Sequence, residues 1–139
     1  MVETINMQEM RYLNLFQTTT HIATRHTFIY NNTLFFCVPK IMISKAIGEG
    51  AKNIRRIGEI LQKKVKVIAS PRGEEDARVF IQAIINPNAF KDLEIRGNEL
   101  ILTAGGTQNK AALIGRNKRR LLGMQKIVQD YFRKDLRIA

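Results

Sequence analysis

The chain has 139 residues, the size of one ordinary domain or two small ones, which excludes a large multidomain enzyme. Hydrophobic residues make up 45% and charged residues 25%, the balance of a folded protein rather than a disordered one. The 23 lysines and arginines outnumber the 12 acidic residues, giving a net charge of +11. We therefore expect polyanions, above all nucleic acids, as partners.

Several classes of protein are not expected from this composition. Cys37 is the single cysteine, so an intramolecular disulfide and a multi-cysteine zinc site are excluded. Glu3, Glu9 and Arg11 put charges in the first residues, so we expect no signal peptide. No apolar run approaches the roughly 20 residues that span a bilayer. We expect a cytoplasmic protein without a membrane partner.

The positive charge is concentrated in two blocks. Residues 40–66 hold eight basic and two acidic residues, a net of +6, and residues 110–137 hold nine and two, a net of +7. The rest of the chain has six basic and eight acidic residues. Two equivalent basic blocks on a slightly acidic background favour a binding role over two ordinary solvated helix faces.

In chain order, the first half predicts a helix, two strands, two helices and a strand. Asn6 and Glu9 form a capping-box-like helix start, and Asn31-Asn32 is a candidate hairpin turn. The expected elements are a helix from residue 6 to the threonines at 18–20, strands at 24–30 and 33–38, helices at 41–47 and from about 53, and a strand at 65–69.

The second half repeats this order. Its expected elements are a helix at 74–85, strands at 93–95 and 100–102, a short helix ending at 114, a longer helix burying Leu121, Met124, Val128 and Phe132, and a strand at 136–138. We infer an α+β chain of two units, residues 1–70 and 71–139, packed with little linker. The aromatic residues expected in the core are Phe16, Phe28, Phe35, Phe36, Phe80 and Phe132.

Each half has a glycine-containing loop between two helices, followed by a basic amphipathic helix. Glycine lets a foreign backbone approach closely, and the free N–H groups and dipole of the following helix favour an anion. Residues 47–54 and 114–121 match the Ile-Gly-x-x-Gly-x-x-Ile loop of the K homology (KH) domain, which clamps about four nucleotides of single strand. The order of elements resembles the type II KH fold, so the resemblance implies two tandem KH domains.

The two loops depart from the KH pattern in different ways. Glu49 puts a negative charge in the first loop, while Ala51 and Lys118 replace the second glycine of each loop. Lys118 and Arg116 make the second loop more cationic. We expect the second unit to contribute more electrostatic affinity and the first to keep the better loop shape.

The chain also resembles the archaeal NusA-like transcription termination and antitermination factors, which are short tandem KH proteins. The resemblance rests on residues 9–16, on Lys45-Ala46-Ile47-Gly48 with residues 53–54 and 63–67, and on Ile114-Gly115-Arg116-Asn117. It implies an RNA-binding factor that influences transcription termination or elongation and has RNA polymerase or an elongation complex as a partner.

The expected RNA-binding residues fall into one set for each loop. The loop glycines are expected to hold phosphates, the cations to supply the field, and the aliphatic residues, including Ile54 and Leu121, to support the core and touch bases. The first set is Ile47, Gly48, Glu49, Gly50, Ala51, Lys52, Asn53, Arg55 and Arg56, and the second is Ile114, Gly115, Arg116, Asn117, Lys118, Arg119 and Arg120.

Enzymatic activity is not expected. His21 and His26 lack further metal ligands nearby, and Ser44 and Ser70 have no histidine at motif distance. A phosphate-binding loop for nucleotide hydrolysis is missing, so no cofactor, metal or small-molecule substrate is expected. Two alternatives to the transcription role remain open: a KH adaptor in ribosome assembly, and a protein-interaction module whose degenerate loops no longer bind RNA.

Overall fold

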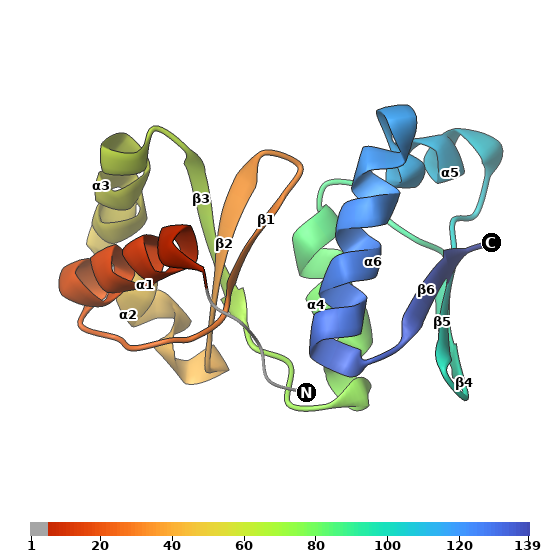
Figure 1. Cartoon of the computed structure of the whole chain (residues 1–139), viewed down its shortest axis with the longest axis horizontal. Helices are drawn as coiled ribbons and strands as arrows, with labels where there is room; N and C mark the ends of the chain where they lie inside the picture. The colour runs from red at the N-terminus through yellow and green to blue at the C-terminus, as the bar shows by residue number, and fades with distance from the viewer. Residues whose placement is uncertain (1–5) are drawn as a thin grey trace. The chain divides into compact units, whose positions relative to one another are not determined.

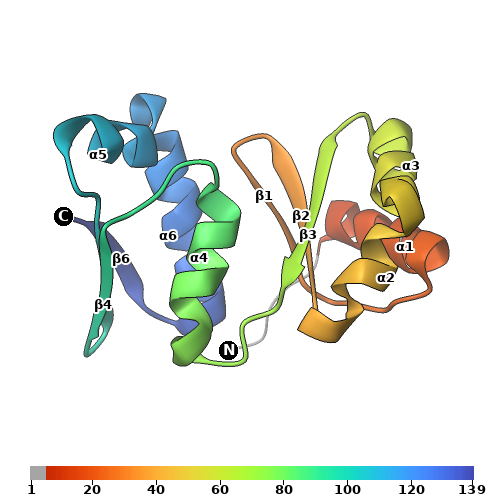
Figure 2. The same cartoon turned by 180° about the vertical axis from the view of Figure 1, so that it is seen from behind.

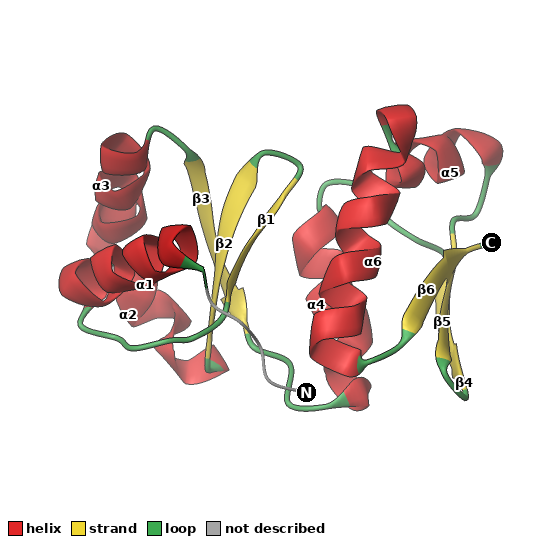
Figure 3. Ribbon diagram, in the orientation of Figure 1, coloured by secondary structure: helices red, strands yellow, loops and turns green. Residues whose placement is uncertain are grey.

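The computed structural model describes residues 6–139 and has an α+β architecture. The chain divides between Ser70 and Pro71 into two compact units. The described residues form six α-helices and two three-stranded sheets, one sheet in each unit (Figures 1 and 3). In the first unit the three α-helices lie on one face of the sheet; in the second unit α4 and α6 do so, and α5 lies near the end of the strands (Figures 1 and 2).

The first unit follows the order helix, strand, strand, helix, helix, strand. Its elements are α1 (Met7–Thr20), β1 (Thr27–Tyr30), β2 (Thr33–Val38), α2 (Ile43–Ile47), α3 (Lys52–Leu61) and β3 (Lys64–Ala69), with 3₁₀ turns at Lys40–Met42 and Glu49–Ala51. β2 lies in the middle of the sheet, antiparallel to β1 and parallel to β3. The β1–β2 hairpin turns at Asn31 and Asn32, both with positive φ, as the sequence predicts.

The core of the first unit lies between this sheet and the three helices. Phe16 of α1 and Phe36 of β2 are fully buried, and their rings stack with centroids 4.4 Å apart. Val38 and Ile57 belong to the same buried cluster. This packing fixes α3 against the sheet, and it thereby fixes the loop that precedes α3.

The second unit has the same order of strands and helices. Its elements are α4 (Ala77–Ile85), β4 (Asp92–Arg96), β5 (Glu99–Thr103), α5 (Thr107–Ile114), α6 (Arg119–Phe132) and β6 (Asp135–Ile138), with 3₁₀ turns at Glu74–Asp76 and Arg116–Lys118. β5 is the middle strand, antiparallel to β4 and parallel to β6. The second sheet thus has the topology of the first.

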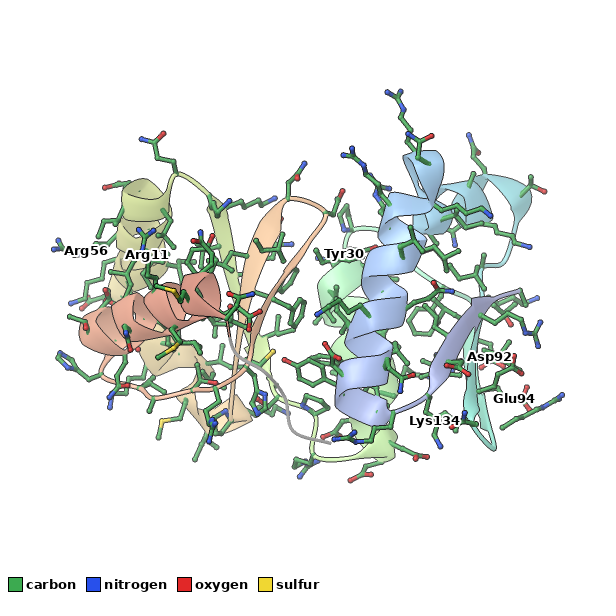
Figure 4. All side chains as sticks on the ribbon, in the orientation of Figure 1. Arg11, Tyr30, Arg56, Asp92, Glu94 and Lys134 are labelled. Carbon is green, nitrogen blue, oxygen red and sulfur yellow. The ribbon has the colours of Figure 1, made fainter. Side chains whose placement is uncertain are left out.

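The edge strand β4 shows why this sheet has one charged face. Leu93 and Ile95 are half-buried, whereas Asp92 and Glu94 are exposed, and Figure 4 shows these two carboxylates on the side away from α6. Because successive side chains of a strand point to opposite faces, the apolar pair faces the helices.

Lys134 connects two further segments of the unit, since its Nζ donates to the Gly97 carbonyl at 2.7 Å and lies 3.4 Å from the Glu74 carboxylate.

Four details differ from the sequence prediction. β1 begins at Thr27 rather than at residue 24, because Thr24 reaches the Cys37 carbonyl through its hydroxyl at 2.6 Å and not through a ladder N–H. Phe28 is half-buried and stacks on Phe35 instead of entering the helix-side core. The acidic residues at 74–76 form a 3₁₀ turn before α4. In α6, Ile127 is buried and Leu121 only half-buried.

None of the helices in residues 6–139 is both long and apolar enough to cross a membrane.

Candidate nucleic-acid interface

The first basic loop joins α2 to α3. α2 ends at Ile47, and the Gly48 N–H donates to the Ser44 carbonyl at 3.0 Å. Gly48 has φ 81° and ψ 163°, and Gly50 (63°, 23°) and Ala51 (62°, 25°) are left-handed. The Ala51 N–H then donates to the Gly48 carbonyl at 3.0 Å. The loop therefore needs a positive φ at three positions, two of which are glycines.

The second basic loop joins α5 to α6 and repeats this geometry. Gly115 has φ 75° and ψ 171°, Asn117 has 55° and 28°, and Lys118 has 61° and 22°. Each of these angles lies within 8° of the angle 67 positions earlier in the chain. The turn closes in the same way, with the Lys118 N–H donating to the Gly115 carbonyl at 3.2 Å.

The backbone shape therefore does not distinguish the two loops. The expectation that the first loop keeps the better shape is wrong, because Asn117 and Lys118 adopt the same left-handed conformations as Gly50 and Ala51. Asparagine tolerates this region better than most residues, whereas alanine and lysine adopt it at a cost of about 1–2 kcal/mol each. The difference between the loops lies in their side chains.

The helices that follow the loops begin without side-chain caps. The residues before them are Ala51 and Lys118, neither of which makes a capping hydrogen bond, and the first turns of α3 and α6 contain no acidic residue. In α1, by contrast, Asn6 accepts from the Glu9 N–H at 2.8 Å. The Lys52 and Arg119 N–H groups donate to the Glu49 and Arg116 carbonyls of the preceding 3₁₀ turns, and no side chain caps the N–H groups that follow them. These groups lie at the positive end of each helix dipole.

Cations stand at these helix starts in place of the usual acids. Lys52 and Arg119 are the first residues of α3 and α6, and both are exposed. A cation beside the positive end of a helix dipole is destabilising by about 0.3–1 kcal/mol. A bound anion would turn this repulsion into attraction, so both helix starts are suited to phosphate.

The second loop carries the stronger charge. Arg116, Lys118 and Arg119 are exposed, and in the described part of the chain their side chains make no hydrogen bond or ion pair. The first loop has Glu49 at the position of Arg116, also exposed. At equal backbone geometry, the second loop is therefore the more electropositive.

Elsewhere in the second unit, six basic side chains form ion pairs with carboxylates. Such pairs join acidic and basic groups on the strands, the helices and the 3₁₀ turn. They are Arg72–Asp76, Arg78–Asp92, Arg96–Glu94, Lys126–Asp130, Lys134–Glu74 and Arg137–Glu99. Pairs at the surface add little stability, but they offset the charge of these six side chains, whereas Arg116, Lys118 and Arg119 of the loop have no such partner in the described residues.

Two of the expected RNA ligands point toward the helix that precedes their loop. The Asn53 Nδ2 donates to the Lys45 carbonyl at 3.2 Å, and the Arg120 Nη1 donates to the Ala112 carbonyl at 2.8 Å. Both acceptors lie in the helix before the loop. These hydrogen-bonding groups are thus engaged in holding the helices together.

Arg55 also differs from a freely exposed cation. Its Nη2 donates to the Gly50 carbonyl at 2.8 Å, so its guanidinium lies directly on the first loop. The equivalent residue of the second unit is Leu122, which is 58% exposed and cannot make this bond. Arg56 is exposed and extends from α3 away from the sheet (Figure 4).

The aliphatic residues beside the loops are half-buried. Ile54 packs against the buried cluster of the first unit, while Ile47, Ile114 and Leu121 remain partly accessible. The structure thus brings each predicted set together as one continuous loop and helix start. It adds the carbonyls of Lys45 and Ala112 and the exposed Leu122, which sequence reasoning missed. Aligning the halves at a 67-residue spacing would have paired Asn53 with Arg120, but it would not have shown their bonds.

The described residues contain no group of three or more His, Cys, Asp or Glu side chains able to hold a metal ion. No protein-family model matches the chain, and no curated protein matches it. A solved structure, "Crystal structure of APE1850", is similar over 97% of this chain and 100% of that chain, with a TM-score of 0.67 and 21% sequence identity. At this identity the similarity establishes the fold alone.

Proposed function

We propose that this protein binds single-stranded RNA through two type II KH domains. The order helix-strand-strand-helix-helix-strand in each unit supports this assignment, as does a central strand parallel to the last strand. The observation that carries the proposal is the repeated loop: two helix starts without caps or acidic residues, preceded by the same left-handed turn and bordered by cations. Such a loop binds phosphates through backbone N–H groups and nearby positive charge.

Bases would lie on the partly accessible aliphatic side chains next to each loop. Ile47 and Ile114 border the loop glycines, and both retain accessible surface. Aliphatic contact requires unstacked bases, so the strand must be single. The phosphate contacts supply affinity that depends on salt, and the base contacts supply preference among sequences.

A salt-series titration with single-stranded RNA, duplex RNA and single-stranded DNA of matched length tests this function. We expect tighter binding of single-stranded RNA and discrimination between RNA sequences that persists at roughly physiological salt. Binding that ignores strandedness and disappears as salt rises would reduce the protein to a general polyanion binder.

We further propose a NusA-like role in transcription, which rests on the sequence resemblance of residues 9–16 and of the two loops. Transcription by the cognate RNA polymerase in vitro, with and without the protein, tests it. We expect a change in pausing or termination that a variant unable to bind RNA does not produce. An unchanged transcript pattern at saturating protein would overturn this role while leaving RNA binding intact.

A protein-interaction module is the second candidate, favoured by the first loop. Glu49 is exposed there, and Arg55 already donates to the Gly50 carbonyl. Co-purification with polymerase subunits after nuclease treatment, together with no measurable RNA affinity, would favour this candidate over the first.

A further inference from the structure

Asn53 and Arg120 occupy equivalent positions, five residues after Gly48 and Gly115 respectively. Each donates to the carbonyl eight residues earlier, in the helix that precedes the loop: Lys45 in the first unit and Ala112 in the second. The two side chains differ in length, charge and shape, yet they make the same interhelical hydrogen bond. What the two units share at this position is therefore the bond and not the residue.

The same side chains also lie against the loop glycines. A Cβ on Gly48 would come within 2.9 Å of Asn53 Cγ, and a Cβ on Gly115 within 2.9 Å of Arg120 Cγ. Glycine is thus needed at the start of each loop for two reasons, a positive φ and the space taken by this neighbour. Glycine, side chain and carbonyl form one packed unit.

The interhelical bond differs from the other hydrogen bonds of the loop in its reach. The backbone bonds from Gly115 to Ala111 and from Lys118 to Gly115 close short local turns. The hydrogen bond of Arg120 joins α6 to the last turn of α5, and its two residues are eight positions apart in the chain. It therefore sets how the two helix ends are held across the loop.

We propose that Asn53 and Arg120 are positioning residues, which fix the loop in its phosphate-binding conformation through the interhelical bond and not by contacting RNA. This inference rests on the proposed function. It separates Arg120 from the neighbouring Arg116 and Arg119, whose exposed side chains make no bond in the described residues and act on the phosphate through their charge.

The alternative is that the Arg120 guanidinium binds a phosphate directly. Its charge is then essential and the bond to Ala112 is incidental. A phosphate ligand contributes about 0.7 to the slope of log affinity against log salt for a single strand, and a neutral positioning residue contributes nothing. The two roles therefore predict opposite results for a substitution that keeps the hydrogen bond and removes the charge: retained RNA affinity for a positioning residue, and lost affinity for a phosphate ligand.

Three variants of the full-length protein distinguish these roles. Arg120→Asn removes the charge but keeps an amide donor. In the first unit the Asn53 amide reaches the equivalent carbonyl, that of Lys45, across a loop of the same backbone shape. Arg120→Met keeps the length without a donor, and Arg120→Lys keeps the charge. We expect Arg120→Met to lose about tenfold in affinity for single-stranded RNA, and Arg120→Asn to remain within about twofold of the parent with an unchanged salt slope.

Hydrogen exchange of the amides in residues 115–118, measured without RNA, gives a second readout. Faster exchange in Arg120→Met with parental exchange in Arg120→Asn supports the inference. Asn53→Leu and Asn53→Arg provide the reciprocal pair in the first unit, where the arginine should retain the loop and the leucine should not. Thermal unfolding of each variant shows whether lower affinity merely follows lower global stability.

The inference is overturned if Arg120→Asn and Arg120→Met lose affinity equally while Arg120→Lys retains it, because charge then decides. It is also overturned if Arg120→Met binds and exchanges like the parent. Failure of the parent protein itself to bind single-stranded RNA would instead contradict the proposed function, and the exchange data would still report whether the interhelical bond orders the loop.

Discussion

Glu49 and Arg116 hold the same position in two loops whose backbone angles agree within 8°. Each follows the first glycine of its loop, and each side chain is exposed. One chain thus presents the same loop shape twice, once with a negative and once with a positive charge. We expect this difference to make the second loop the main electrostatic contact with RNA.

Reversing these two charges should change RNA binding in opposite directions. We expect Arg116→Glu to weaken binding of single-stranded RNA. The slope of log affinity against log salt concentration should become shallower by about 0.7 for each phosphate that the loop no longer neutralises. Glu49→Arg should strengthen binding and steepen the slope. Fluorescence anisotropy over a series of salt concentrations measures both quantities.

Arg96→Glu is the matched control for Arg116→Glu. It makes the same change in charge within the same unit, but at the β4–β5 hairpin, which lies at the opposite end of the unit from the α5–α6 loop (Figures 1 and 2). Its ion pair with Glu94 is exposed, but Glu99 lies opposite it on β5, so thermal unfolding of Arg96→Glu must show that repulsion among the three carboxylates leaves the unit folded. Equal weakening by both substitutions would show that net charge, and not the loop, governs affinity.

Ala51→Gly should stabilise the protein. Ala51 has φ 62°, where a Cβ is unfavourable, so glycine should raise the free energy of unfolding by about 1 kcal/mol. Ala111→Gly in the exposed part of α5 should lower it by about 0.5–1 kcal/mol, because glycine weakens a helix interior. Urea denaturation measures the free energy of unfolding of both variants. A decrease for Ala51→Gly as well as for Ala111→Gly would contradict the left-handed conformation of Ala51.

Lys118→Gly separates loop shape from loop charge. The substitution removes the strain of a left-handed lysine, with φ 61°, and also one exposed cation. We expect higher stability in urea denaturation together with weaker, less salt-dependent RNA binding. Tighter RNA binding by this variant would mean that backbone access limits affinity and that the charge does not.

Aspartate at either loop glycine should disrupt RNA binding. Both positions have a positive φ and a neighbour within 2.9 Å of the new Cβ, so the two substitutions should strain the loop similarly. The aspartate of Gly115→Asp also offsets positive charge in the more cationic of the two loops. We expect Gly115→Asp to cost more affinity than Gly48→Asp in the anisotropy titration. Gly97→Asp is the control, since its φ is 54° and nothing lies within 4 Å of its Cβ.

Phe36→Ala should destabilise the first unit by about 3–5 kcal/mol, because the substitution removes a fully buried ring that stacks on Phe16 and leaves a cavity. Ile41→Ala should change stability by less than about 0.5 kcal/mol, since Ile41 is 88% exposed. Urea denaturation measures both. A small effect of Phe36→Ala would mean that the ring is not part of a tightly packed core.

Local patterns predict the elements of this chain well. The glycines at 48 and 115 end helices as expected, and β2 spans Thr33–Val38 as its apolar run indicates. Periodicity is less reliable where a side chain replaces a backbone bond, as Thr24 does before β1. It also misplaces Phe28, since a strand pattern alone does not reveal which of two apolar faces the helices cover.

The charge, the order of elements and the position of the two loops can all be predicted from sequence, because they depend on residues close together in the chain. The shared backbone conformation of Ala51 and Lys118 cannot, nor can the inward turn of Asn53 and Arg120 to the helix before each loop. Alanine and lysine both disfavour the left-handed conformation that they adopt here, and Asn53 and Arg120 differ in length, charge and shape. The packing of the helices on each sheet brings the two ends of the loop together, and these contacts join residues too far apart in the chain for a local pattern to predict.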